Sequence, residues 1–323
     1  MTDTFRFPPF LKKGDKVAIL SPAGKIDKHF IAGAKQRFEE WGLKVSVGKH
    51  AGGSSGRFSG TTRQRLADLQ KAMDDPDIQA ILCSRGGYGC IHLIDKIDFT
   101  VFREHPKWLL GYSDITLLHA LLQKEGFASI HSLMARHLTT EPADDPCTRQ
   151  LHDLMFGQCP HYQFEGHQLN KKGKATGILR GGNLSVLYSL RGTGYDFPPE
   201  GAILFIEDIG ERPYHIDRMM NNLRLGGILE KLNGLIVGQF TEYEEDPSLG
   251  KIVYEMMADL VKDYPYPVCF GFPVGHASRN YPLVCGSKVE ITVSKKSVEL
   301  KTCTPKQGEP LPALCKNKEQ QQQ

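Results

Sequence analysis

The sequence lacks any long apolar segment. No stretch approaches the roughly 20 consecutive apolar residues that a membrane-spanning helix needs, although 40% of the 323 residues are hydrophobic. The start of the chain, Met1-Thr2-Asp3-Thr4-Phe5-Arg6, also lacks the apolar centre of a secretory signal peptide. We therefore expect a cytoplasmic protein that does not act at a membrane.

An excess of charge of one sign is also missing. The 40 basic and 37 acidic residues leave a net charge of +3, and the basic residues are scattered along the chain. Proteins that bind nucleic acid through its phosphates usually concentrate basic residues on one surface. The sequence therefore gives no reason to expect a nucleic-acid partner.

Metal-binding patterns of cysteine and histidine are absent as well. The eight cysteines include no C-x-x-C pair, and the 12 histidines include no H-E-x-x-H pair. We expect reduced thiols, with a structural disulfide or a zinc site as less favoured alternatives. The sequence accordingly predicts neither a metal site nor a cofactor.

The first half of the chain alternates short apolar runs with helical patterns. Such alternation is typical of βαβ units and of a mainly parallel sheet flanked by helices. Ligands bind beyond the carboxyl ends of the strands in sheets of this kind. The expected strands are 16–20, 44–47, 78–83 and 108–110, and the expected helices are 28–41, about 62–73, and one that begins near Asp114.

The alternation weakens between about 140 and 176, where prolines and the run Asn170-Lys171-Lys172-Gly173 indicate a connection between domains. We expect an α/β protein with a second, smaller, mixed α/β domain. The predicted organisation is an N-terminal domain over 1–160, a linker over 161–176, a C-terminal domain over 177–305 and a disordered tail over 306–323. Strands are expected at 202–206, 235–238, 267–270, 288–293 and 297–301, and helices at 184–190, 214–230 and 250–262.

Two loops at predicted strand ends carry candidate chemistry. Ser113 lies in Gly111-Tyr112-Ser113-Asp114, between a strand and a helix, where a sharp turn exposes a side chain beside free N–H groups. The alternative is that Ser113 or Asp114 only caps the helix. The loop Arg85-Gly86-Gly87-Tyr88-Gly89 follows another strand, and its glycines permit a backbone to approach a ligand closely, or simply form a tight turn.

An acid and a histidine in the second half are further candidates. Glu207 and Asp208 end an apolar strand, so we expect one of them at the rim of a site, although a surface salt-bridge cluster is the alternative. His276 follows the strand 267–270. A single histidine in a loop is more often structural or solvated, and the other histidines make the choice of His276 uncertain from composition alone.

Taken together, these segments resemble the LD-carboxypeptidase family of serine peptidases, over nearly the whole chain. Their order and spacing are more specific than any one of them. Family members often carry His-Gly-Pro-Met after the serine helix, whereas this chain has His131-Ser132-Leu133-Met134. The resemblance therefore implies the triad but does not define the local shape of the site wall. The matching segments are Gly14-Asp15-Lys16-Val17, Ser21-Pro22-Ala23, Arg85-Gly86-Gly87-Tyr88-Gly89, Gly111-Tyr112-Ser113-Asp114-Ile115-Thr116, Gly181-Gly182-Asn183-Leu184, Glu207-Asp208 and Gly271-Phe272-Pro273-Val274-Gly275-His276.

The resemblance implies a triad with Ser113 as nucleophile, His276 as general base and Glu207 as the residue that orients the histidine. It places the oxyanion hole at the backbone N–H groups of Gly87 and Asp114. It also implies two domains with the active site between them, and a homodimer. The implied substrate is a muropeptide, cut before its terminal D-alanine during peptidoglycan recycling.

A carboxypeptidase must also recognise a terminal carboxylate, for which a guanidinium is suited. Arg85, Arg212 and Arg279 are candidates from their positions near the site loops, and Tyr88 is a fourth substrate-binding candidate. Two other interpretations remain open. Relatives of the microcin C immunity proteins use the same triad on a peptidyl- or aminoacyl-nucleotide, and an α/β protein could also bind a small molecule without catalysis.

Overall fold

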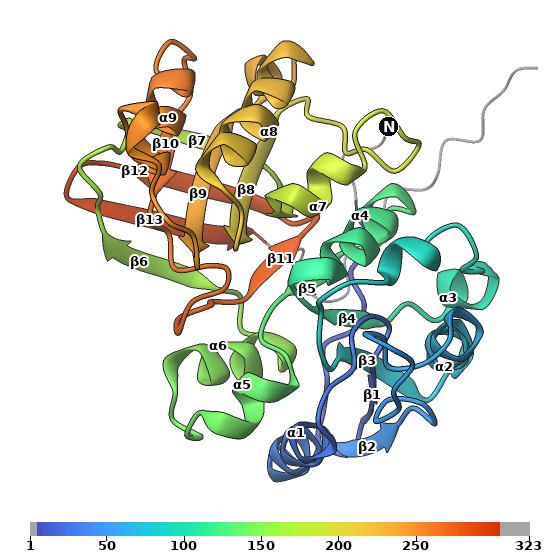
Figure 1. Cartoon of the computed structure of the whole chain (residues 1–323). Coiled ribbons are helices and arrows are strands. Elements are labelled where there is room, and N and C mark those ends of the chain that lie inside the picture. Colours follow the sequence, from blue (N-terminus) through green and yellow to red (C-terminus); the bar gives the residue numbers. More distant parts are fainter. Residues whose placement is uncertain (1–4, 304–323) are drawn as a thin grey trace, which may run out of the picture.

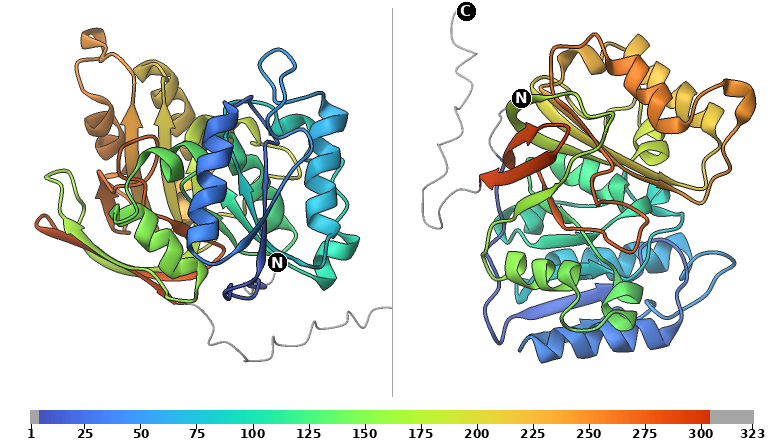
Figure 2. Two further views of the ribbon diagram at one scale, coloured as in Figure 1. Left: turned by 90° about the horizontal axis from the view of Figure 1, so that it is seen from below. Right: turned by 90° about the vertical axis from the view of Figure 1, so that its left-hand side faces the viewer.

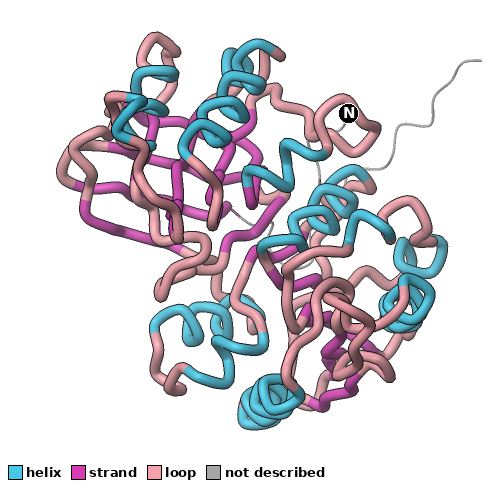
Figure 3. Tube along the Cα trace, viewed as in Figure 1, coloured by secondary structure: helices cyan, strands magenta, loops and turns pink. Residues whose placement is uncertain are grey.

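The computed structural model describes residues 5–303, and these residues form two sheets with helices packed against them (Figure 1). The predicted tail over 306–323 lies outside the described residues. Figure 2 shows the two sheets in separate lobes, and Figure 3 shows that both lobes contain helices as well as strands. This architecture confirms the expected α/β class.

The first sheet has six strands in the order β11-β5-β4-β3-β1-β2. Its five N-terminal strands are parallel, and the sixth, β11, comes from the C-terminal half and pairs antiparallel with β5. This return of the chain joins the two halves at the edge of the first sheet. The strands are β1 (Lys16–Leu20), β2 (Lys44–Val47), β3 (Ile78–Cys83), β4 (Trp108–Gly111), β5 (Ser129–His131) and β11 (Leu283–Cys285).

Helices cover both faces of the first sheet because alternate strand residues point to opposite sides. Leu20 and Ile81 pack with one group of helices, whereas Ile19 and Leu82 pack with the other. Local signals fix the helix ends: Thr61 caps α2 with its hydroxyl and forms a capping box with Gln64. The first group is α2 (Thr62–Asp74), α3 (Thr100–Glu104) and α4 (Thr116–Lys124), and the second is α1 (Lys28–Glu40), α5 (Ala135–Thr140) and α6 (Pro146–Met155).

The second sheet has seven strands in the order β10-β9-β8-β7-β12-β13-β6, parallel from β10 to β7 and antiparallel beyond. One face packs against α7 (Leu184–Ser189), α8 (Pro213–Leu225) and α9 (Val253–Val261) (Figure 1). The strands are β6 (His161–Glu165), β7 (Gly173–Asn183), β8 (Ala202–Ile209), β9 (Gly234–Thr241), β10 (Val268–Phe270), β12 (Lys288–Val293) and β13 (Ser297–Cys303).

The segment 161–176, expected as a linker, is one correction to the sequence analysis. Residues 161–165 form edge strand β6, and residues 173–176 already belong to β7. Tyr162 explains the difference. This residue is 4% exposed and its hydroxyl donates to the Pro282 carbonyl, so a mostly polar segment is anchored by one buried side chain. The expected helix 214–230 also ends earlier, at Leu225, before a 3₁₀ turn at Leu229–Lys231.

Candidate active site

The turn that carries Ser113 has the strained geometry of a nucleophile elbow. Strand β4 ends at Gly111, a 3₁₀ turn covers Ser113–Ile115, and α4 follows directly. Ser113 has a φ of 65°, a left-handed value that side chains other than glycine rarely adopt. The close packing of Gly86 supports this turn, because a Cβ there would lie 2.7 Å from the Ser113 Cβ.

Asp114 connects the serine turn (residues 111–115) to the glycine-rich loop (residues 85–89) and the 3₁₀ turn that follows it. Its buried carboxylate accepts a hydrogen bond from the Cys90 N–H at 2.8 Å, so it does not serve as a helix cap. Burial raises the pKa of Asp114, although the Cys90 hydrogen bonds and the Arg65 charge oppose that effect. The two loops that sequence reasoning selected are therefore tied together.

The two backbone N–H groups expected in the oxyanion hole belong to the loop 85–89 and to the serine turn. In the described part of the chain, neither the Gly87 nor the Asp114 N–H donates a hydrogen bond. The Asp114 nitrogen would lie 3.1 Å from a Cβ at Gly86, so the two loops meet at this nitrogen. Unpaired donors at the start of a helix are suited to stabilising an oxyanion.

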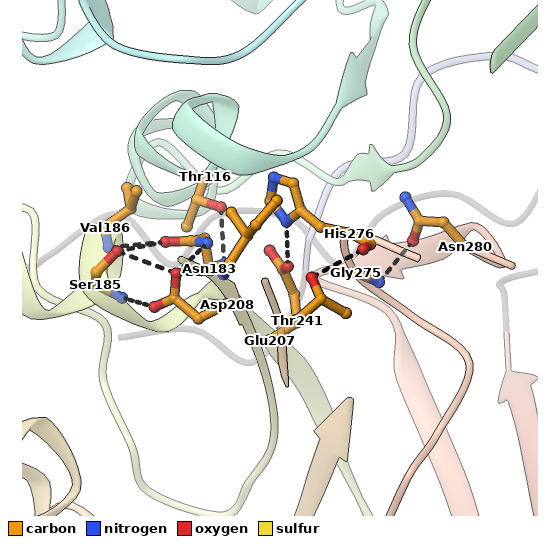
Figure 4. Close-up of polar contacts among 11 residues, drawn as sticks. Thr116, Asn183, Ser185, Val186, Glu207, Asp208, Thr241, Gly275, His276 and Asn280 are labelled. Carbon is orange, nitrogen blue, oxygen red and sulfur yellow. Dashed lines mark hydrogen bonds and ion pairs between the residues drawn. The ribbon is translucent and has the colours of Figure 1, made fainter. Parts of the chain in front are cut away.

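The buried Glu207 and the partly exposed His276 form a hydrogen-bonded pair (Figure 4). The His276 Nδ1 lies 2.7 Å from Glu207 Oε2, and the Glu207 side chain is 0% exposed against 13% for His276. We expected Glu207 or Asp208 at the rim of a site, but β8 continues to Ile209 and both carboxylates are buried. The arrangement excludes the alternatives of a surface salt-bridge cluster and of a solvated histidine.

Three contacts fix the position of the loop that carries His276. Gly275 has a φ of +120°, and a Cβ there would lie 2.7 Å from the Glu207 Cβ, so the loop can approach Glu207 only because this residue is glycine. The Gly275 N–H donates to Asn280 Oδ1 at 3.0 Å, and Thr241 Oγ1 donates to the His276 carbonyl at 3.0 Å. These bonds fix the direction of the imidazole.

Acidic neighbours make His276 more basic than a free imidazole. Burial alone would lower the pKa of His276, but the hydrogen bond with Glu207 and the charges of Glu207, Asp208 and Glu242 outweigh burial and raise it. A general base with a raised pKa accepts a proton more readily, provided that the solution pH keeps it neutral.

The serine turn and the acid–histidine pair meet where the two halves of the chain come together. The ring of Tyr112, the residue before Ser113, lies 4.7 Å from the His276 ring, centroid to centroid. No hydrogen bond joins Ser113 to His276 within residues 5–303. Catalytic hydrogen bonds are often long in ligand-free enzymes and shorten when substrate binds, so this geometry is compatible with a triad.

Comparisons with known proteins identify the family. Residues 17–132 match the model of the LD-carboxypeptidase N-terminal domain, and residues 176–291 match that of its C-terminal domain. The chain is 36% identical over 300 residues to the probable murein peptide carboxypeptidase of Bacillus subtilis, which covers 90% of this chain and 92% of the relative. The chain belongs to the LD-carboxypeptidase family. It is a hydrolase, a carboxypeptidase of the serine type.

Further relatives agree with this assignment. The murein tetrapeptide carboxypeptidase of Pseudomonas aeruginosa is 31% identical, over 82% of this chain and 89% of its own. The crystal structure of the muramoyltetrapeptide carboxypeptidase from Oxalobacter formigenes superposes with a TM-score of 0.81 at 26% identity, over 89% of this chain and 98% of that one. The microcin C7 self immunity protein MccF has a TM-score of 0.80 at 21% identity, over 92% of this chain and 98% of its own, which shows a shared fold.

The four predicted substrate-binding residues of this LD-carboxypeptidase lie in different settings. Arg85 is exposed but donates to the Lys25 carbonyl at 2.7 Å. The exposed Tyr88 ring lies 6.0 Å from Phe58. Arg212 lines a surface pocket of about 530 Å³ beyond the ends of β8 and β9. Arg279 is exposed in the loop that carries His276.

Sequence reasoning considered Asp208 only as the alternative to Glu207 at the rim of a site, whereas the structure buries it beside Glu207. Burial, followed by the negative charge of Glu207, raises the pKa of Asp208 to about 6. Its carboxylate accepts from Asn183 Nδ2 at 2.9 Å and from the Ser185 N–H at 2.7 Å (Figure 4). The adjacency of two acids at a strand end was the available signal in the sequence.

The remaining observations concern metals, thiols and membranes. Within residues 5–303, no group of three acidic, histidine or cysteine side chains is arranged to hold a metal ion, and no helix is both long and apolar enough to span a bilayer. Cys83, Cys90, Cys147, Cys269 and Cys285 are buried and have free thiols. Burial raises the pKa of the Cys285 thiol to about 12, so this thiol is not a nucleophile.

Proposed function

We propose that this LD-carboxypeptidase hydrolyses the amide bond before the terminal D-alanine of a murein tetrapeptide, in cell-wall recycling. The names of the relatives from Bacillus subtilis and Pseudomonas aeruginosa support murein peptide as the substrate. The observation that carries the proposal is the hydrogen bond between Glu207 and His276. The His276 ring packs against Tyr112, the residue before the strained Ser113.

In the proposed mechanism, Ser113 Oγ attacks the scissile carbonyl while His276 Nε2 takes its proton. The Nδ1 proton of His276 stays in the hydrogen bond with Glu207, which fixes the tautomer and stabilises the imidazolium. The N–H groups of Gly87 and Asp114 stabilise the oxyanion, an effect of about 3 kcal/mol per donor. His276 then protonates the departing amine of D-alanine, and water releases the acyl group.

The substrate carboxylate requires a cation, and we assign this role to one of Arg85, Arg212 and Arg279, with Tyr88 as a neighbouring contact. Replacing the responsible arginine with alanine raises KM far more than it lowers kcat, because the lost contact is made equally in ground and transition states. We also propose that the enzyme is a cytoplasmic homodimer, in keeping with the family resemblance. Light scattering coupled to size exclusion measures its mass in solution.

The decisive experiment incubates the protein with a defined murein tetrapeptide and measures the loss of one D-alanine by mass spectrometry. Ser113→Ala is the matched control, and an active Ser113→Ala variant contradicts the assigned nucleophile. An aminoacyl-nucleotide amide is tested in parallel, and faster turnover of that substrate would favour the microcin-type activity. Binding of the tetrapeptide by the folded protein without any cleavage would contradict the proposed substrate.

A further inference from the structure

The first turn of α4, which follows the serine, is bonded to the end of β7 in the other half of the molecule. Thr116 is fully buried, and its Oγ1 accepts the Asn183 N–H at 3.1 Å (Figure 4). The backbone approaches closely because residue 182 is glycine, with a φ of +140°; a Cβ there would lie 2.5 Å from Thr116 Oγ1. This contact fixes the distance between the serine helix and the second sheet.

A second hydrogen bond joins the same helix and strand. Arg180 Nη1 donates to Gln123 Oε1 at 3.1 Å, near the far end of α4. Two bonded points along α4 define its direction against β7 as well as its distance. The position of the serine turn therefore depends on the position of β7.

From Asn183 the polar contacts continue to the strand that carries Glu207. Asn183 lies opposite Glu207 in the β7–β8 pairing, and its Nδ2 donates to Asp208 Oδ1 at 2.9 Å. Asp208 also accepts the Ser185 N–H at 2.7 Å and the Ile209 N–H at 2.9 Å. These bonds hold the end of β7, the start of α7 and the end of β8 together around one carboxylate.

We propose that Thr116 and Asp208 are positioning residues that hold Ser113 in catalytic register with the Glu207–His276 pair across the junction of the two halves. The inference rests on the proposed function, because it concerns the same triad. Neither residue touches the reacting atoms: Thr116 acts through the helix that carries Ser113, and Asp208 acts through Asn183 and through its charge beside Glu207.

The Thr116 part is tested with a pair of variants. Thr116→Val keeps the shape of the side chain but removes the acceptor, which leaves the buried Asn183 N–H unpaired. Displacement of a reacting group by about 1 Å can lower rates by about 100-fold, so we expect kcat to fall by about 10- to 100-fold while KM stays nearly constant. Thr116→Ser restores the hydroxyl and should restore kcat.

A folded Thr116→Val variant with the wild-type kcat would overturn the proposal, as would equal losses in Thr116→Val and Thr116→Ser. If Thr116→Val does not fold, Thr116→Ala supplies the same comparison without a second methyl group facing Asn183. The rate at which a fluorophosphonate labels Ser113 is measured on each variant as well, because it reports serine activation without any peptide substrate. We expect that rate to fall in parallel with kcat.

The Asp208 part is tested through the titration of His276. Among the described residues, the charged or titratable groups around His276 are Glu207 and Asp208 on β8, Glu242 after β9, His131 on β5, and Tyr112, whose ring packs against the imidazole. Asp208→Asn removes one negative charge from this set, so we expect a lower pKa for the His276 imidazole, measured by ¹⁵N NMR. Glu200→Gln is the control, because Glu200 lies just before the start of β8, at the end away from Asp208, and pairs with Lys231.

An unchanged His276 pKa in folded Asp208→Asn, or an equal shift in Glu200→Gln, would overturn the role of Asp208. The NMR and labelling measurements need no substrate. They therefore separate a failure of this inference from a failure of the proposed function. If the wild-type enzyme is labelled at Ser113 but cleaves no tetrapeptide, the proposed substrate is wrong, whereas the proposed roles of Thr116 and Asp208 are not contradicted.

Discussion

Replacing Gly275 with alanine should push Glu207 and His276 apart, although neither of these two residues is substituted. The new Cβ would lie 2.7 Å from the Glu207 Cβ and 2.9 Å from Glu207 Oε2, against 3.4–4 Å for an ordinary contact. Glu207 or the loop must therefore retreat by about 1 Å, a displacement that can lower a rate about 100-fold. The φ of +120° adds backbone strain of about 1–3 kcal/mol.

We therefore expect Gly275→Ala to fold with a reduced melting temperature and to lose about 100-fold in kcat/KM. The assay is D-alanine release from the tetrapeptide. Gly14→Ala is the matched control for strain, because Gly14 has a φ of +91° and a Cβ added there would meet no atom within 4 Å. A folded Gly275→Ala enzyme with wild-type kcat/KM would refute the argument that catalysis requires the close contact between this loop and Glu207.

Three further predictions concern the same site. Ser113→Ala should lower kcat by up to about 10⁶-fold without altering the circular dichroism spectrum. Gly86→Ala, whose Cβ would lie 2.7 Å from that of Ser113, should lower kcat about 100-fold by displacing the oxyanion donors, as measured by steady-state kinetics. Because the pKa of His276 is raised, kcat/KM should fall as the pH drops through a value above 6.5, and Glu207→Gln should move that limb of the pH profile to lower pH; an unmoved limb would contradict the pairing.

Much of the first sheet could be predicted because its signals are local. The run Ile78–Cys83 is wholly apolar except for Gln79, and the structure has a strand over the same residues. The serine turn was also recognisable, since Gly111 and Ser113 lie between a buried strand and an apolar helix. Such local patterns depend on neighbours within a few residues, and these are visible in a sequence.

Contacts between distant segments could not be predicted in this way. Strand β5 was missed because Ser129 and His131 are polar, and their burial depends on His119 and on the Tyr112 and Phe205 rings, which other elements bring to them. The burial of Glu207 likewise depends on Gly275, far along the chain. The pattern of apolar and polar residues within β5 or β8 gives no information about these distant partners.

The antiparallel pairing of β11 with β5 has a consequence for dividing the protein. A fragment that ends at residue 160 would contain the serine turn but would leave the hydrogen-bonding edge of β5 uncovered, and an open edge strand favours aggregation. Its complement would carry Glu207 and His276 with three strand residues, Leu283–Cys285, deprived of their sheet. We therefore expect that neither lobe folds correctly when it is expressed without the other.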